Sequence, residues 1–245
     1  ETFEGCLLLE SINIPNEVKL IEYMAFANSG LTSIKIPDTV TYAYDYCFYK
    51  CYSLHTVNIS AKMTSLSRDL FKECINLKSI DLQNSINRIH ENAFHSCIAL
   101  ENITIPDTVR NVDDKCFFNC TNLRSVILPK YLTYLQKSMF ENCISLASIN
   151  LTAIKTLYSR SFANCGITFI NFPNTLSSLE SDVFIGCEKL HTITVDENNT
   201  QYKAIDNVLF NIYCTKIIYY HYKKNSSNYI IPDGVITISK ECFKN

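Results

Sequence analysis

Hydrophobic residues recur along this chain with a period of 22 or 23 residues. Phe marks the period most clearly, at Phe3, Phe26, Phe48, Phe71, Phe94, Phe117, Phe140, Phe162 and Phe184. A Leu stands six residues after most of these Phe, and in two shortened units Leu31 and Ile167 stand five residues after. Self-similarity at a fixed period of this length predicts a repeat protein, in which each unit packs against its neighbours.

Each unit contains the pattern of one half-buried strand. Apolar and polar residues alternate after the Leu, as in residues 102–105, which predicts a strand with one buried face. All six Pro directly follow such a strand, and Pro closes a strand because it has no N–H to donate. A second apolar pair follows, such as Val109 and Val112, and we expect it to form the opposite wall of the core.

The segment around each Phe has the spacing apolar-Phe-x-x-Cys, as in residues 90–97 and 136–143. This spacing predicts one or two turns of helix with Phe and Cys facing inward. A single unit cannot bury its own core, so the units must stack. The pattern therefore predicts an α/β solenoid, with a parallel sheet of short strands on the concave side and short helical turns on the convex side.

The repeat is regular over residues 1–195 and is then interrupted. Residues 204–221 contain two β-rich runs joined around 211–215, which predicts a hairpin. We expect a single solenoid over 1–245, made of regular repeats (1–195), a hairpin island (196–228) and a resumed repeat (229–245). The chain starts without Met inside one repeat and stops inside another, so we expect a fragment that lacks its caps.

Composition and charge exclude several functional classes. The 22 Lys and Arg nearly cancel the 24 Asp and Glu, which leaves a net charge of −2 and no electrostatic reason to expect nucleic acid as a partner. No apolar run approaches the length that spans a bilayer, so we expect no membrane insertion within these residues. Five Gly in 245 residues argue against Gly-rich phosphate-binding loops. No cofactor is expected.

The unit L-x-x-I-x-I-P-x-x-V-x-x-I-x-x-x-A-F-x-x-C, nearly intact from Leu100 to Cys120, resembles the BspA-like leucine-rich repeats of bacterial and protist surface proteins. The segment from residue 198 to 235 is similar to a hairpin insertion of that family, although Asn207 stands where the family usually has Gly and His221 where it has Pro. The resemblance implies a leucine-rich repeat fold. It also implies a non-enzymatic surface protein that binds extracellular matrix, host cells or other microbes.

Twelve Cys raise the question of disulfides, metal or catalysis. Eight stand three residues after a repeat Phe: Cys6, Cys51, Cys74, Cys97, Cys120, Cys143, Cys165 and Cys187. We expect buried free thiols, with disulfides along the column as the alternative. No C-x-x-C occurs, so no metal site is expected. His55 and His191 each follow a column Cys by four residues, but the same Cys recurs without His, so we expect no catalytic Cys/His pair and no enzyme.

Six N-x-S/T sequons occur, a number close to chance for a chain this rich in Asn, Ser and Thr. They begin at Asn58, Asn102, Asn119, Asn150, Asn198 and Asn225. A glycan on the strand columns would cover the concave side. If the protein is glycosylated, we expect Asn198 or Asn225 to be modified first.

The outward positions of the strands are the candidate ligand-binding residues, because a repeat sheet offers a rigid surface whose outer side chains are free of packing constraints. They are Ser33, Lys35, Thr56, Asn58, Ser79, Asp81, Asn102, Thr104, Ser125, Ile127, Ser148, Asn150, Phe169, Asn171, Thr192 and Thr194. Most are small, polar and uncharged. A strand face that is exposed to solvent and binds nothing tolerates the same residue types. Ile127 and Phe169 break this pattern and are candidate binding hot spots, unless the register is misread there or a neighbouring chain covers them.

The expected partners are protein ligands, among them matrix or host-cell surface proteins, with glycans as a further class. Tyr213, Tyr219, Tyr220 and Tyr222 in the island are a second candidate contact surface, with core packing expected for about half of them. The predicted function is that of a cell-surface or secreted adhesion module. The alternative is an intracellular scaffold for protein interactions, which the many thiols favour.

Overall fold

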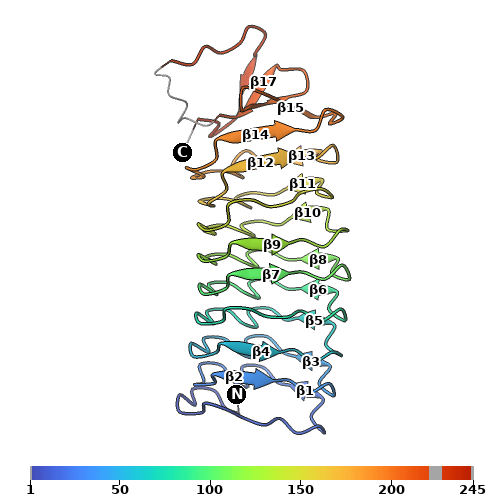
Figure 1. Cartoon of the computed structure of the whole chain (residues 1–245), viewed down its shortest axis with the longest axis vertical. Helices are drawn as coiled ribbons and strands as arrows, with labels where there is room; N and C mark the ends of the chain where they lie inside the picture. Colours follow the sequence, from blue (N-terminus) through green and yellow to red (C-terminus); the bar gives the residue numbers. More distant parts are fainter. Residues whose placement is uncertain (1, 221–227, 244–245) are drawn as a thin grey trace.

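The computed structural model describes residues 2–220 and 228–243, and its turns stack along one long axis (Figure 1). The strands of the stack are β1 (Leu20–Ile21), β2 (Ser33–Lys35), β3 (Tyr42–Ala43), β4 (Thr56–Asn58), β5 (Ser65–Leu66), β6 (Arg88–Ile89), β7 (Asn102–Thr104), β8 (Asn111–Val112), β9 (Ser125–Ile127), β10 (Tyr134–Leu135), β11 (Thr156–Leu157), β12 (Phe169–Phe172), β13 (Ser178–Leu179) and β14 (Thr192–Val195). All their pairings are parallel, as expected for strands that recur once per turn.

These strands form two walls of the stack. The front sheet comprises β2, β4, β7, β9, β12 and β14, paired as β2–β4, β7–β9 and β12–β14. The back wall comprises the two-residue strands β1, β3, β5, β6, β8, β10, β11 and β13. Figure 1 shows the two walls as separate columns of arrows, one strand of each in most turns. The predicted parallel strands and opposite wall are thus confirmed, although the front strands pair as three separate two-stranded sheets and not as one continuous sheet.

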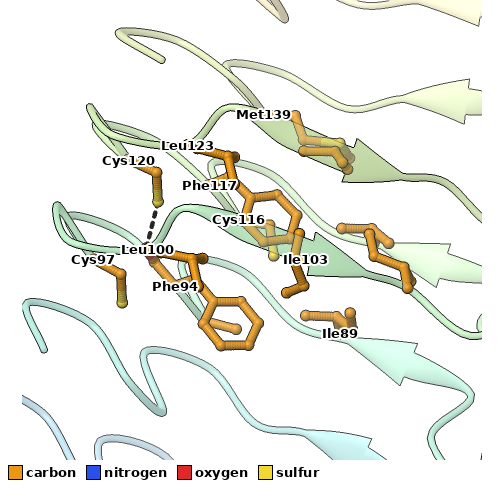
Figure 2. Close-up of a cluster of buried hydrophobic side chains, with 14 of the residues drawn as sticks. Ile89, Phe94, Cys97, Leu100, Ile103, Cys116, Phe117, Cys120, Leu123 and Met139 are labelled. Carbon is orange, nitrogen blue, oxygen red and sulfur yellow. Dashed lines mark hydrogen bonds between the residues drawn. The ribbon is translucent and has the colours of Figure 1, made fainter. Parts of the chain in front are cut away.

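The repeat Phe side chains form a continuous stack through the core. Between Phe3 and Phe184, consecutive ring centroids lie 5.4 to 5.8 Å apart and the rings are nearly parallel. Figure 2 shows Phe94 and Phe117 in this arrangement, with Leu100 and Leu123 beside them. Offset stacking of aromatic rings at such distances adds to the free energy gained by burying them.

The predicted helical turns are wrong, because the described residues contain no helix. The residues two before and two after most repeat Phe have positive φ, for example 54° at Lys115 and 59° at Asn119 around Phe117. An α-helix requires negative φ throughout, so left-handed residues four apart divide the segment into separate turns. The N–H groups of this segment bond across to the next turn instead, as from Phe117 to the Met139 carbonyl at 3.1 Å. The fold is therefore a β-solenoid.

Gly marks the two shortened units. A Cβ at Gly30 would overlap the carbonyl oxygen of Leu7, and a Cβ at Gly166 would overlap that of Ile144. The backbones of adjacent turns approach each other closely at this corner. A residue without Cβ is required there.

The island forms a small sheet from β15 (Tyr202–Ile205), β16 (Val208–Asn211), β17 (Lys216–Tyr219) and β18 (Thr237–Ile238), in that order. The predicted hairpin around 211–215 is present between β16 and β17. A second hairpin, which the sequence analysis did not predict, joins β15 to β16 through Asp206 and Asn207. Both have positive φ, as two-residue hairpin turns of the primed types require. β17 then pairs in parallel with β18 of the resumed repeat.

Candidate binding surface

The front sheet brings the candidate residues together in two columns that run along the stack. Strand registers place Ser33 beside Thr56, Asn102 beside Ser125, and Phe169 beside Thr192. Every candidate side chain is exposed except Thr192, which is half-buried. The intervening residues, such as Ile34 and Val57, are buried. The alternation read from the sequence thus sets which side chains face the solvent.

The surface of the columns is polar and carries little charge. Neighbouring side chains bond to one another in places, as where Thr194 donates to the Asn171 Oδ1 at 2.8 Å. Two apolar side chains stand out, because Ile127 is 59% and Phe169 is 49% exposed. The register predicted from the sequence is therefore correct at both positions. Exposed apolar side chains in a polar surround are typical of binding hot spots.

Three hollows open along the edge of the front sheet. The first, about 400 Å³, is lined among others by Lys35, Asn58 and Asp81. The second, also about 400 Å³, lies beside Ile127, and the third, about 310 Å³, lies beside Phe169. The second and third share Asn150, which lies in the turn between them.

The hollows contain residues that the sequence analysis did not select, notably Gln83 and Thr152. Both occupy the position that is Pro in the units ending at Pro106 and Pro129. No strand of the front sheet forms at residues 79–82 or 148–151 in the described chain, apart from one bridge between Asn58 and Asp81.

The column thiols point into the core and donate to backbone carbonyls. All twelve Cys are free, and those of the column are buried except Cys6. The Cys120 Sγ donates to the Phe94 carbonyl at 3.1 Å, and the Cys97 Sγ does the same to Phe71. Burial raises the pKa of the Cys120 thiol to about 12, because the thiolate would be desolvated there. A buried thiol that keeps its proton is a poor nucleophile.

The Cys/His pairs do not form. The Cys51 Sγ donates to the Phe26 carbonyl at 3.0 Å, while His55 is exposed. The Cys187 Sγ donates to the Phe162 carbonyl at 2.9 Å, while the Nδ1 of His191 contacts Thr192. Each thiol therefore donates its hydrogen bond to a backbone carbonyl of the preceding turn and not to a His side chain.

The island places its Tyr side chains differently. Tyr219 and Tyr220 are buried, and Tyr213 is 82% exposed. Burial also raises the pKa of Tyr219. Tyr222 and the sequon at Asn225 lie outside the described residues. Asn198 is exposed in the turn after β14, where its N–H donates to the Asp196 Oδ1 at 2.9 Å.

Repeats of about 23 residues, a Phe stack and a Cys column point to one family of solenoids. The model of the BspA-type leucine-rich repeat region, with six copies, matches residues 1–124 and 111–223. The chain belongs to the BspA-type leucine-rich repeat family. This repeat fold is typically a non-enzymatic scaffold for binding other proteins.

Solved structures of bacterial leucine-rich repeat proteins are similar to this BspA-type chain. A leucine-rich cell surface protein of Faecalibacterium prausnitzii is 30% identical, with a TM-score of 0.68 over 92% of this chain and 56% of that one. A protein of Bacteroides ovatus is 26% identical, with a TM-score of 0.59 over 73% of this chain and 59% of that one. This chain thus spans less than two thirds of either. A Treponema pallidum protein, 22% identical, shares the fold, with a TM-score of 0.57 over 71% of this chain and 72% of that one.

No curated protein matches the chain. Within residues 2–220 and 228–243, no helix has the length and apolar character needed to cross a bilayer.

Proposed function

We propose that this BspA-type solenoid is a non-enzymatic adhesion module of the cell surface, which binds protein ligands of the extracellular matrix, host cells or other microbes through its front sheet. The observation that carries the proposal is the pair of exposed columns, held rigidly by the Phe stack and interrupted by Ile127 and Phe169. The surface location of the similar F. prausnitzii protein supports the proposed localisation.

Most of the binding energy would come from the part of the front sheet around Ile127 and Phe169. Ile127 and Phe169 flank the turn that contains Ser148 and Asn150, and the two adjacent hollows give apolar ligand groups a place to be buried. Each side chain would contribute by losing its remaining exposed area on binding. The polar columns around them would supply hydrogen bonds to the ligand.

The test is binding of the purified chain to immobilised collagen and fibronectin and to intact cells. The double substitution Ser125→Arg with Ser148→Arg places two bulky charges on adjacent turns and should abolish binding while the thermal melt stays unchanged. The matched control is Thr156→Arg with Ser178→Arg, which are direct neighbours on the back wall. Equal binding by the front variant and the unmodified chain would move the site to another surface. Ile127→Ser and Phe169→Ser should each weaken binding about tenfold or more.

The free state of all twelve thiols favours a second candidate, an intracellular scaffold for protein interactions. Antibody staining of live, unpermeabilised source cells separates the two. Surface staining supports the adhesion module, and staining that requires permeabilisation supports the scaffold.

A further inference from the structure

Two opposite charges stand at one end of the otherwise neutral columns. Lys35 and Asp81 are the charged residues among the outward positions from Ser33 to Thr194. Both are exposed, and within the described chain neither takes part in a salt bridge. Unpaired charges on a neutral surface set the charge of whatever binds there.

The registers of three turns fix how these charges are arranged. Lys35 lies directly beside Asn58, and Asn58 lies directly beside Asp81. Two inter-strand spacings therefore separate the backbones of Lys35 and Asp81, which is about 9.6 Å. The Asn58 side chain lies between the two charges.

The first hollow lies between these residues and has a volume of about 400 Å³. Thr56, Ser79 and Gln83 line it in addition to Asn58, and supply hydroxyl and amide groups. A second carboxylate, Asp38, lies at its edge but accepts a hydrogen bond of 2.9 Å from the Ala61 N–H. Lys35 and Asp81 are the charged residues of the outward columns that line it.

The spacing selects among the regular conformations of a polypeptide ligand. In a polyproline II segment, residues i and i+3 lie on the same side and about 9.3 Å apart. In an extended strand, neighbours on one side are about 6.6 Å apart. In an α-helix, the nearest equivalent pair at this range is i and i+7, about 10.5 Å apart. The polyproline II repeat fits the backbone spacing of Lys35 and Asp81 best.

The neutral groups of the hollow fit the same ligand. A polyproline II segment has no internal hydrogen bonds, so its backbone carbonyls need outside partners. The amide of Asn58, the amide of Gln83 and the Thr56 hydroxyl are donors within the hollow. A segment with this backbone is also ordered before binding, which lowers the entropic cost of association.

We propose that the hollow between Lys35 and Asp81 binds a polyproline II segment of a protein ligand, with an acidic side chain against Lys35 and a basic one three residues away against Asp81. This inference rests on the proposed function of the front sheet and names the chemistry that one end of it recognises.

The test is fluorescence anisotropy with the labelled peptide Pro-Pro-Glu-Pro-Pro-Lys-Pro-Pro, at low and high ionic strength. Control peptides carry Gln in place of both charges, carry Glu and Lys as neighbours, or place Glu and Lys seven apart in an Ala-rich helix. We expect binding of the first peptide, loss of about tenfold or more for each control, and weakening as salt rises. Absence of binding, or tighter binding of the helical peptide, overturns the inference.

Protein variants test the two charges separately. Lys35→Gln and Asp81→Asn should each weaken binding about two- to fivefold, and Lys35→Glu or Asp81→Lys about tenfold. The variant that combines Lys35→Glu with Asp81→Lys should bind the peptide in which Lys precedes Glu. Lys155→Glu and Asp233→Lys, at exposed positions elsewhere, are the matched controls. Equal peptide affinity across all variants overturns the inference. Loss of matrix binding by the Ser125→Arg, Ser148→Arg variant would then still support the proposed function.

Discussion

The Cys120 thiol donates a hydrogen bond to the carbonyl oxygen of Phe94, 26 residues earlier in the chain and one turn below in the stack (Figure 2). The same relationship joins Cys74 to Phe48 and Cys143 to Phe117, at 3.1 and 3.2 Å. The Phe94 carbonyl also accepts the N–H of Cys97 in its own turn. The column of thiols therefore links each turn to its neighbour.

Removal of one thiol should destabilise the stack. We expect Cys120→Ala to lower the free energy of unfolding by about 1 to 3 kcal/mol, because it leaves a small cavity and removes a buried donor. Cys120→Ser should cost less, since Ser29 already occupies the same column position, buried and 3.5 Å from the Cys51 Sγ. Denaturant unfolding measures both. Cys214→Ala, at a half-buried island position, is the control, and an equal loss there would contradict the role of the column.

The Phe stack predicts a difference between its middle and its end. Phe117 stacks on two rings and is fully buried, whereas Phe3 stacks on Phe26 and is half-buried. Phe117→Ala should lower the free energy of unfolding by about 3 to 5 kcal/mol, and Phe3→Ala should lower it clearly less. Thermal and denaturant melts of both variants decide the point. Similar losses would mean that the stack does not act as a continuous core.

The left-handed turns predict that Gly is tolerated at defined positions. Lys115 has a φ of 54°, which costs a side chain energy that Gly avoids, so Lys115→Gly should be neutral or stabilising by up to about 1 kcal/mol. Lys137 lies in the next turn without positive φ, and Lys137→Gly should destabilise by about 0.5 to 1 kcal/mol. If Lys115→Gly destabilised the protein more than Lys137→Gly, the helical interpretation of this segment would be restored.

Stability should fall in alkaline solution. Burial raises the pKa of Cys120 and Cys165 from the usual value of 9.0 to about 12. Between these two values the unfolded chain loses thiol protons that the folded chain retains, so rising pH favours unfolding. Below about pH 9 both states keep the protons and the effect vanishes. Each such thiol should lower the unfolding free energy by about 1.4 kcal/mol per pH unit in that window.

The measurement is denaturant unfolding at pH 7.5, 9 and 10, with reducing agent present. The Cys120→Ser variant should show a smaller decline than the unmodified chain. A stability that stays constant up to pH 10 would contradict the burial of the column.

Several features of the fold were predictable because they repeat. The alternation around Ile103 and Ile105 identified a strand, and its recurrence placed Asn102, Thr104 and their equivalents on one exposed face. An error in the register of one repeat would have broken the period, so the register of each repeat was supported by that of the others. The exposure of Ile127 and Phe169 followed from the same register.

The helical turns were predicted wrongly because Phe and Cys three residues apart face the same way in a helix and also in the observed turns. The spacing is compatible with both, and the choice depends on where the backbone N–H groups bond. In the stack, the N–H of Phe117 reaches the Met139 carbonyl of the next turn, which no local pattern reveals. Positive φ at Lys115 was equally hidden, since Lys rarely adopts it.

The sequence by itself determined the period, the buried columns and the outward columns of this protein, because each depends on apolar spacing along the chain. The tertiary structure alone decided the rest. It showed that backbone bonds between turns replace those of helices, and that Gln83 and Thr152 line hollows beside the front strands. It also placed Lys35 two turns from Asp81 across Asn58. These features depend on how one turn lies on the next, which apolar periodicity does not specify.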